Sequence, residues 1–159
     1  VFELHEDDWR QIELISINHA HDIQAEISDV QQIYKTSAVR GGFRTLHVRK
    51  RITTPLKLSF HGVLSAFPNA HLYEGIAYER IAGLIDGGFG FETGDCVLFG
   101  EQHQNAVNAL CLAWTPDEHP KVLFSNQLKS LMENYGLVLV DWCRCTVFRT
   151  ETLEKFWSS

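Results

Sequence analysis

Hydrophobic residues are most concentrated between Leu137 and Phe148, a segment that reads Leu-Val-Leu-Val-Asp-Trp-Cys-Arg-Cys-Thr-Val-Phe. Its first four residues are apolar on both alternating faces, so a strand made of them needs cover on both sides of a sheet. We therefore predict a central strand over residues 137–148. Alternation then places Asp141 on a face where the pattern predicts core, together with Cys143 and Cys145.

Apolar residues at helical spacing predict helices before and after this strand and in the first half of the chain. The clearest is residues 22–34, which has an acid in its first turn and two glycines beyond its end. The others are a helix with its N-cap at Thr54 that ends before Pro68, a helix capped by Ser125 or Asn126 and ended by Gly136, and a short closing helix over residues 150–157.

Alternating or continuously apolar segments predict the remaining strands. Residues 72–85 have helical apolar spacing, but Gly75 and Gly83 weaken that interpretation. Together the elements predict an α+β fold with a mixed or antiparallel sheet packed by three to five helices. The predicted strands are residues 9–17, for which a helix is the alternative, residues 43–52, residues 107–114, and a hairpin in which residues 89–91 and 96–99 flank Glu92-Thr93-Gly94-Asp95.

The composition fits one globular domain over residues 1–159, because 159 residues with 45% hydrophobic content can bury a core of their own. No apolar run approaches the roughly 18 residues that span a bilayer. The first residues, Val-Phe-Glu-Leu, carry neither a basic leader nor an apolar signal segment. Four cysteines are too few for a disulfide scaffold. We expect a cytoplasmic protein that does not act at a membrane.

The formal net charge of −6 argues against nucleic-acid binding as the main function. The charge is unevenly distributed, since residues 1–29 hold eight acids and one base, whereas residues 30–73 hold seven bases and no acid. We predict that a basic face lies beside acidic ones and is matched to them within the fold.

No motif in the chain declares a metal site or a cofactor site. Cys143 and Cys145 could offer two thiols to a soft metal, but the four-ligand spacing of a structural zinc site is missing, which favours packed thiols. His19 and His21 could act as ligands or in acid–base chemistry, yet they fall at a strand-to-helix junction where polar capping residues are expected. The glycine-rich residues 83–94 fit neither the P-loop pattern, which requires Gly-Lys-Ser or Gly-Lys-Thr, nor a Gly-x-Gly-x-x-Gly at a strand-to-helix turn.

Two arrangements would allow more specific chemistry. His103 and Cys111 could be the base and nucleophile of a small hydrolase, with Asp95, Glu101 or Asp141 orienting the imidazole. Cys111 lies between two leucines, however, which favours an inert core thiol. Asp141 either has a raised pKa and a catalytic role or is paired. The candidate partners of Asp141 are Arg44, Arg49, Arg51 and Arg144.

Two charged segments are candidate interfaces with another protein. Acids beside an aromatic anchor suit recognition of a basic surface, and the N-terminal cluster offers Glu3, Glu6, Asp7 and Asp8 beside Trp9. The competing interface is a cationic ribbon on the outer face of the predicted strand over residues 43–52, which includes His47, Arg49 and Arg51.

Three segments carry a resemblance to a known family. They read Leu-His-Glu-Asp-Asp-Trp-Arg-Gln-Ile-Glu at residues 4–13, Gly-Phe-Arg-Thr-Leu-His-Val-Arg at residues 42–49, and Leu-Val-Leu-Val-Asp-Trp-Cys-Arg at residues 137–144. These segments resemble small bacterial immunity proteins encoded beside polymorphic or secretion-system toxins. The resemblance implies a short, acidic, cytosolic and catalytically inert protein that occludes the active site of a toxin.

We therefore expect a binding protein that neutralises a cognate bacterial toxin and uses no cofactor. The expected contact residues are the acidic cluster with Trp9 and, as the competing site, the cationic ribbon. The alternative function is a small cytosolic hydrolase that depends on His103 and Cys111.

Overall fold

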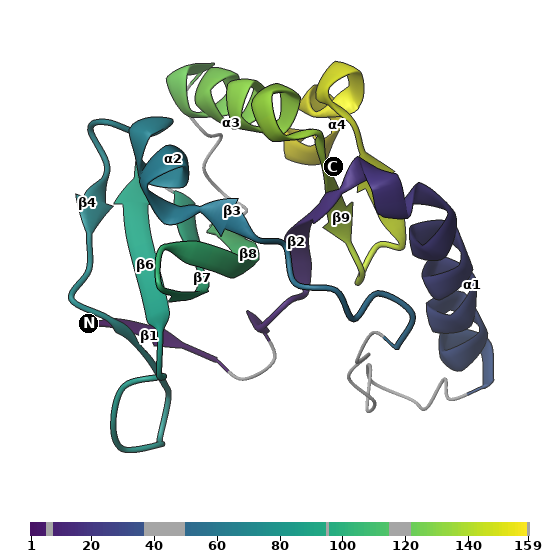
Figure 1. Cartoon of the computed structure of the whole chain (residues 1–159). Helices are drawn as coiled ribbons and strands as arrows, with labels where there is room; N and C mark the ends of the chain where they lie inside the picture. Colours follow the sequence, from purple (N-terminus) through teal and green to yellow (C-terminus); the bar gives the residue numbers. More distant parts are fainter. Residues whose placement is uncertain (6–7, 37–49, 95, 115–121, 159) are drawn as a thin grey trace.

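A computed structural model of the chain describes residues 1–5, 8–36, 50–94, 96–114 and 122–158 (Figure 1). The helices are α1 (Ala20–Thr36), α2 (Phe60–Ser65), α3 (Val122–Tyr135) and α4 (Glu154–Trp157), with 3-10 turns η2 (Ile17–His19) and η3 (Thr150–Thr152). The strands are β1 (Phe2–Leu4), β2 (Ile12–Ser16), β3 (Leu58–Ser59), β4 (His71–Leu72), β5 (Ile76–Tyr78), β6 (Gly88–Thr93), β7 (Cys96–His103), β8 (Ala106–Trp114), β9 (Leu137–Asp141) and β10 (Thr146–Phe148).

One eight-stranded sheet organises the described residues, and its strand pairs are antiparallel. The strands lie in the order β10-β9-β2-β8-β7-β6-β4, and β3 pairs with β8 outside this path. β1 and β5 form a separate parallel pair, in which Glu3 lies opposite Ala77. The predicted α+β class is confirmed, with four α-helices in the described part of the chain.

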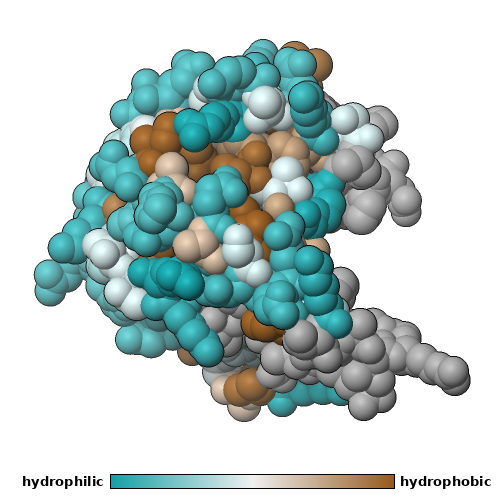
Figure 2. Space-filling model, turned by 90° about the vertical axis from the view of Figure 1, so that its right-hand side faces the viewer, coloured by the Kyte–Doolittle hydropathy of each residue, from teal (hydrophilic) through white to brown (hydrophobic). Residues whose placement is uncertain are grey.

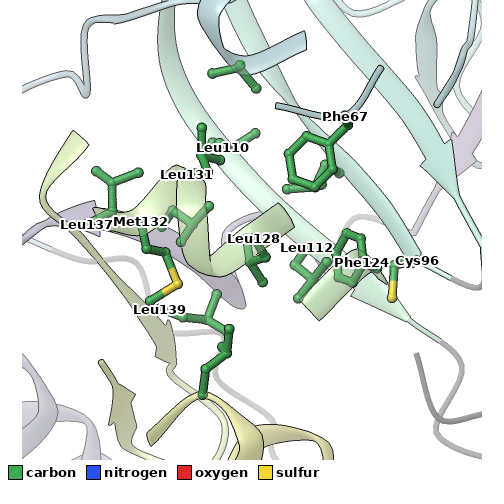
Figure 3. Packing of buried hydrophobic residues seen from close by; sticks show 14 of the residues in the cluster. Phe67, Cys96, Leu110, Leu112, Phe124, Leu128, Leu131, Met132, Leu137 and Leu139 are labelled. Atoms are coloured by element: carbon green, nitrogen blue, oxygen red, sulfur yellow. The ribbon is translucent and has the colours of Figure 1, made fainter. Parts of the chain in front are cut away.

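Helices α2, α3 and α4 cover one face of the main sheet (Figure 1). α3 buries a stripe of side chains at helical spacing against the strands below it, which is why its sequence forms an amphipathic helix (Figure 3). The stripe consists of Phe124, Leu128, Leu131 and Met132. The strand residues in the same core include Leu98, Leu110, Leu112, Leu137 and Leu139.

The opposite face of the sheet is covered in two parts. Helix α1 packs over β2 and β9, and the β1–β5 pair packs over β7 and β8. The core under α1 joins Ile23, Ile27, Val30 and Ile52 to Ile15, Val138, Val140 and Trp142. The core under β1 and β5 joins Leu4 and Ile76 to Phe99 and Cys111. The N-terminal strand is therefore part of a layer that seals the middle of the sheet.

The predicted continuous strand over residues 137–148 is wrong. β9 ends at Asp141, and residues 142–145 turn the chain into β10. The Asp141 carboxylate accepts a hydrogen bond of 3.0 Å from the backbone N–H of Arg144, which closes the turn. All five residues of β9 are buried, as the apolar pattern indicated. However, β9 lies beside the edge strand β10 and not at the centre of the sheet.

The helix predicted from Thr54 begins only at Phe60, with Ser59 as its N-cap. The residues before it run along β8, because the Leu56 N–H donates to the carbonyl of Asn108 at 3.1 Å. Pairing with a strand distant in the sequence thus takes precedence over the local Thr-Pro capping signal.

The other element predictions are confirmed for the most part. The predicted 22–34 helix is α1, the predicted hairpin is β6 and β7, and the predicted strand 107–114 is β8. β2 covers only Ile12–Ser16 of the predicted strand 9–17. α3 starts at Val122, earlier than predicted, and ends before Gly136, whose φ of 61° fits the predicted left-handed cap.

Three further predicted segments have different outcomes. Residues 72–85 hold the end of β4, all of β5 and turns, and no helix. Residues 43–49 of the predicted strand 43–52 lie outside the described residues, and residues 50–52 are not in a strand. The short closing helix is confirmed as η3 followed by α4.

Candidate functional site

Trp9 lies on a turn between β1 and β2 and packs against the small core under the β1–β5 pair. Its ring centroid is 6.0 Å from that of Phe99, at an interplanar angle of 43°. The next residue, Arg10, has φ of 58°, so the backbone reverses just after the tryptophan. Trp9 is half-buried, and its contact with Phe99 holds the ring in place.

Exposed carboxylates surround this core, and we call this region the acidic end. The Lys and Arg side chains described on the same elements are Arg10 and Arg80, and Arg10 Nη2 lies 3.9 Å from a Glu101 carboxylate oxygen. The local balance of charge is therefore negative. The exposed carboxylates belong to Glu3, Asp8, Glu74, Glu79, Asp86 and Glu92.

The sequence shows only the N-terminal part of the acidic end, and the fold adds acids from distant segments to it. Parallel pairing of β1 with β5 brings Glu3 beside Ala77, about seventy positions along the chain. Glu3 and Asp8 are the predicted acids of the N-terminal cluster that the structure describes, and both are exposed. Glu6 and Asp7 lie outside the described residues.

Of the three predicted contact residues in the cationic ribbon, the structure describes only Arg51. His47 and Arg49 lie outside the described residues. Arg51 is exposed, but its guanidinium Nε donates to Asp29 of α1 at 2.8 Å, and this contact raises the pKa of Arg51. The predicted matching of the basic segment to acids within the fold is thus confirmed for Arg51.

A buried carboxylate holds the same segment by its backbone. Glu26 of α1 is 1% exposed, and its two oxygens accept hydrogen bonds of 2.9 Å from the backbone N–H groups of Lys50 and Arg51. Sequence analysis missed this role. The signal for it is spacing, because Glu26 is three residues from Ile23 and four from Val30 on the apolar side of α1.

Asp141 is used inside the fold. Its carboxylate, 3% exposed, accepts hydrogen bonds from both the backbone and the guanidinium of Arg144, one of its four predicted partners. The Arg144 guanidinium also lies over the ring of Phe156, 4.9 Å from the ring centroid. This arrangement fixes the β9–β10 turn to α4 and gives Asp141 a structural role.

Cys143 and Cys145 lie in the β9–β10 turn and do not share a strand face. Burial, followed by the nearby carboxylate of Asp141, raises the pKa of each thiol, so both stay protonated at neutral pH. Burial, followed by the nearby groups of Cys143, Cys145 and Asp141, raises the pKa of Tyr34 to about 12. Within the described ranges, no three His, Cys, Asp or Glu side chains are grouped to hold a metal ion.

The structure does not bring His103 and Cys111 together. His103 is opposite Ala106 at the turn end of the β7–β8 hairpin, whereas Cys111 is opposite Phe99. Ala106 and Cys111 are five positions apart along β8, which corresponds to roughly 16 Å along a strand. Cys111 is also fully buried. The geometry that the hydrolase hypothesis requires is therefore not present.

His19 and His21 lie where the sequence placed them, at the junction of β2 with α1. His19 ends the turn η2 and lines a cavity of about 30 Å³ next to Glu13, Thr54 and Asn108. This volume is sufficient for water and too small for a substrate. Glu13, which is 1% exposed, accepts a hydrogen bond of 3.0 Å from the Trp142 indole N–H, a second buried carboxylate that sequence analysis missed.

A larger hollow lies where α3 ends. Its volume is about 220 Å³, and its apolar wall includes Ile17 and Met132 while Arg149 and Glu151 add charged groups of both signs. Figure 2 shows the side of the molecule that carries α1, where hydrophobic surface interrupts a mostly hydrophilic face. In this described lining the Thr150 hydroxyl donates to the Glu151 carboxylate at 2.9 Å, and the lining holds no histidine or cysteine.

Comparison of the chain with protein-family models, with curated proteins and with solved structures gives no match in any of the three. None of the described helices has both the length and the apolar character needed to cross a membrane.

Proposed function

We propose that this chain is a binding protein of the immunity type, which neutralises a cognate bacterial toxin in the cytoplasm by occluding the toxin's active site. The observation that carries the proposal is the acidic end, where exposed carboxylates lie on the elements whose small core holds the half-buried ring of Trp9. A carboxylate-rich surface complements a basic partner and speeds its association, and a half-buried aromatic residue supplies contact area at little entropic cost.

The use of the other charged groups supports the same proposal. Arg51 is engaged by Asp29, and Asp141 is engaged by Arg144, so both serve the fold. The resemblance of residues 4–13, 42–49 and 137–144 to immunity proteins also supports a binding role over a catalytic one.

Reversal of the N-terminal charges is the experiment that tests the contact site. We expect the triple variant Glu6→Lys, Asp7→Lys, Asp8→Lys to bind the toxin encoded beside its gene at least about tenfold more weakly, mainly through slower association. The reason is that three acids, of which the described one, Asp8, is exposed, would become bases facing a basic surface. Surface plasmon resonance at two salt concentrations measures both rates, and the wild-type association rate should fall as salt rises.

The matched control is the cationic ribbon, with Arg49→Gln and Arg51→Gln together. We expect its affinity to stay within about twofold of wild type, because the proposal places the ribbon outside the contact surface. If the triple Lys variant keeps its affinity and the Arg49→Gln, Arg51→Gln variant loses affinity, the ribbon is the interface and the acidic cluster is not. Circular dichroism of both variants should match the wild type, since the described members of each set, Asp8 and Arg51, are exposed.

A further inference from the structure

The segment between β5 and β6, residues 79–87, projects from the acidic end as a closed loop below β1 and β6 (Figure 1). Both of its ends are fixed by backbone hydrogen bonds to neighbouring strands. The Glu79 N–H donates to the carbonyl of Leu4 at 2.9 Å, and the Ile85 N–H donates to the carbonyl of Ile76 at 2.9 Å. On β7, the Gln102 N–H donates to the carbonyl of Gly87 at 2.8 Å. Three strands therefore hold the base of the loop.

The tip of this loop is apolar and faces solvent. Ile81 is 54% exposed and Leu84 is 58% exposed, and Ala82 and Gly83 between them are exposed as well. Gly83 has φ of 95°, a conformation that glycine adopts without strain, and it turns the chain between the two large side chains. Two exposed aliphatic residues on one short fixed tip form a protruding contact surface.

Leu84 is held in place from one side. A Cβ atom on Gly75 would lie 3.1 Å from Leu84 Cδ1, so the leucine side chain rests directly over this glycine. The bonds at the base of the loop and this contact restrict the tip before any partner arrives. A surface ordered in advance loses less conformational entropy on binding, which raises its affinity.

Charge next to the tip defines the kind of partner that fits it. Glu79 and Asp86 flank the apolar residues within the loop, and Glu74 lies just before β5. Within residues 79–87, Arg80 is the only Lys or Arg residue. An apolar tip with carboxylates around it matches an apolar pocket that has Lys or Arg side chains at its rim.

We propose that Ile81 and Leu84 form the central anchor of the interface and insert into an apolar, Lys/Arg-rimmed pocket of the partner protein. This inference rests on the proposed function, so the partner is the toxin whose active site is occluded. Apolar anchors at the centre of an interface carry most of the binding energy, while the surrounding charged contacts exclude water and set the association rate.

The test measures binding of the full chain to the toxin encoded beside its gene, by surface plasmon resonance. Ile81→Asp and Leu84→Asp should each weaken binding at least about tenfold, mainly through faster dissociation. The matched control is Val122→Asp, which adds the same charge to an apolar residue that is 77% exposed on α3. The control should stay within about twofold of the wild-type affinity.

Two further variants distinguish a loss of binding from a loss of folding. Ile81→Ser and Leu84→Ser remove the hydrophobic surface without adding charge, and they should also weaken binding while the thermal unfolding midpoint is unchanged. If both Ser variants keep full affinity, the loop is not the anchor of the interface, whatever the result with the Asp variants. Failure of the wild type to bind the toxin at all overturns the proposed function and this inference together, so the two failures are distinguishable.

Discussion

Substitution of Gly100 by alanine should destabilise the protein by about 3 kcal/mol or more. Gly100 lies in β7 at the centre of the sheet, opposite Leu110 of β8. A Cβ atom there would overlap the carbonyl oxygen of Ala109 and lie 2.8 Å from its carbonyl carbon. Backbone atoms cannot rotate away as a side chain can, so β7 and β8 would have to separate. Both faces of the sheet depend on this strand pair.

Urea unfolding of Gly100→Ala and wild type measures this loss through the shift of the transition midpoint. The control is Gly94→Ala in the β6–β7 turn, where an added Cβ meets nothing within 4 Å but φ is 64°. Left-handed backbone alone should cost that control roughly 1 kcal/mol. An equal loss in the two variants would contradict the close approach of β8 to Gly100.

Substitution of Glu26 by alanine should have the second largest effect, a loss of about 2–4 kcal/mol. The two carboxylate oxygens accept backbone hydrogen bonds from Lys50 and Arg51, and hydrogen bonds to a charged group contribute more than neutral ones. Their loss would leave two partly buried N–H groups without this acceptor. It would also release Ile52, which is 3% exposed, from the core under α1.

Chemical unfolding and amide hydrogen exchange together measure this effect. Exchange at Lys50 and Arg51 should accelerate in Glu26→Ala far more than exchange in β7. Glu133→Ala, which removes an exposed carboxylate from α3, serves as the control and should change stability by less than about 0.5 kcal/mol. If Glu26→Ala behaves like Glu133→Ala, the carboxylate does not hold this segment.

Local patterns predicted those elements in which each residue's environment depends on near neighbours. The stripe of Ile23, Ile27 and Val30 is enough to predict α1, because helical spacing alone determines which side is buried. The β6–β7 hairpin is predicted for the same reason, since its turn lies between two apolar runs. The fold class follows from such elements together.

The errors arise where a residue has two local interpretations. Asp141 fits either a buried polar residue in a long strand or the first residue of a turn, and the Arg144 N–H decides for the turn. Thr54 fits a helix N-cap, but the pairing of Leu56 with Asn108 of β8 keeps the chain extended. Both decisions depend on groups that alternation and spacing do not reveal.

The candidate site was predictable only in part. The acidic character near Trp9 is visible in the sequence, and Asp8 is exposed beside it as expected. The contribution of Glu3, Glu74 and Glu79 to one surface depends on the parallel pairing of β1 with β5. A two-stranded contact between short segments so far apart in sequence has no local signature, so the part of the acidic end beyond the N-terminal cluster emerges only from the fold.

Titration of the toxin's own activity tests the proposed inhibition of a toxin by this chain. The toxin encoded beside the gene should be assayed at fixed concentration while the wild-type protein is added in steps. We predict that activity falls in proportion to the protein added and is abolished near roughly one equivalent, as tight binding requires. Full toxin activity in the presence of a large excess of the protein would contradict the account.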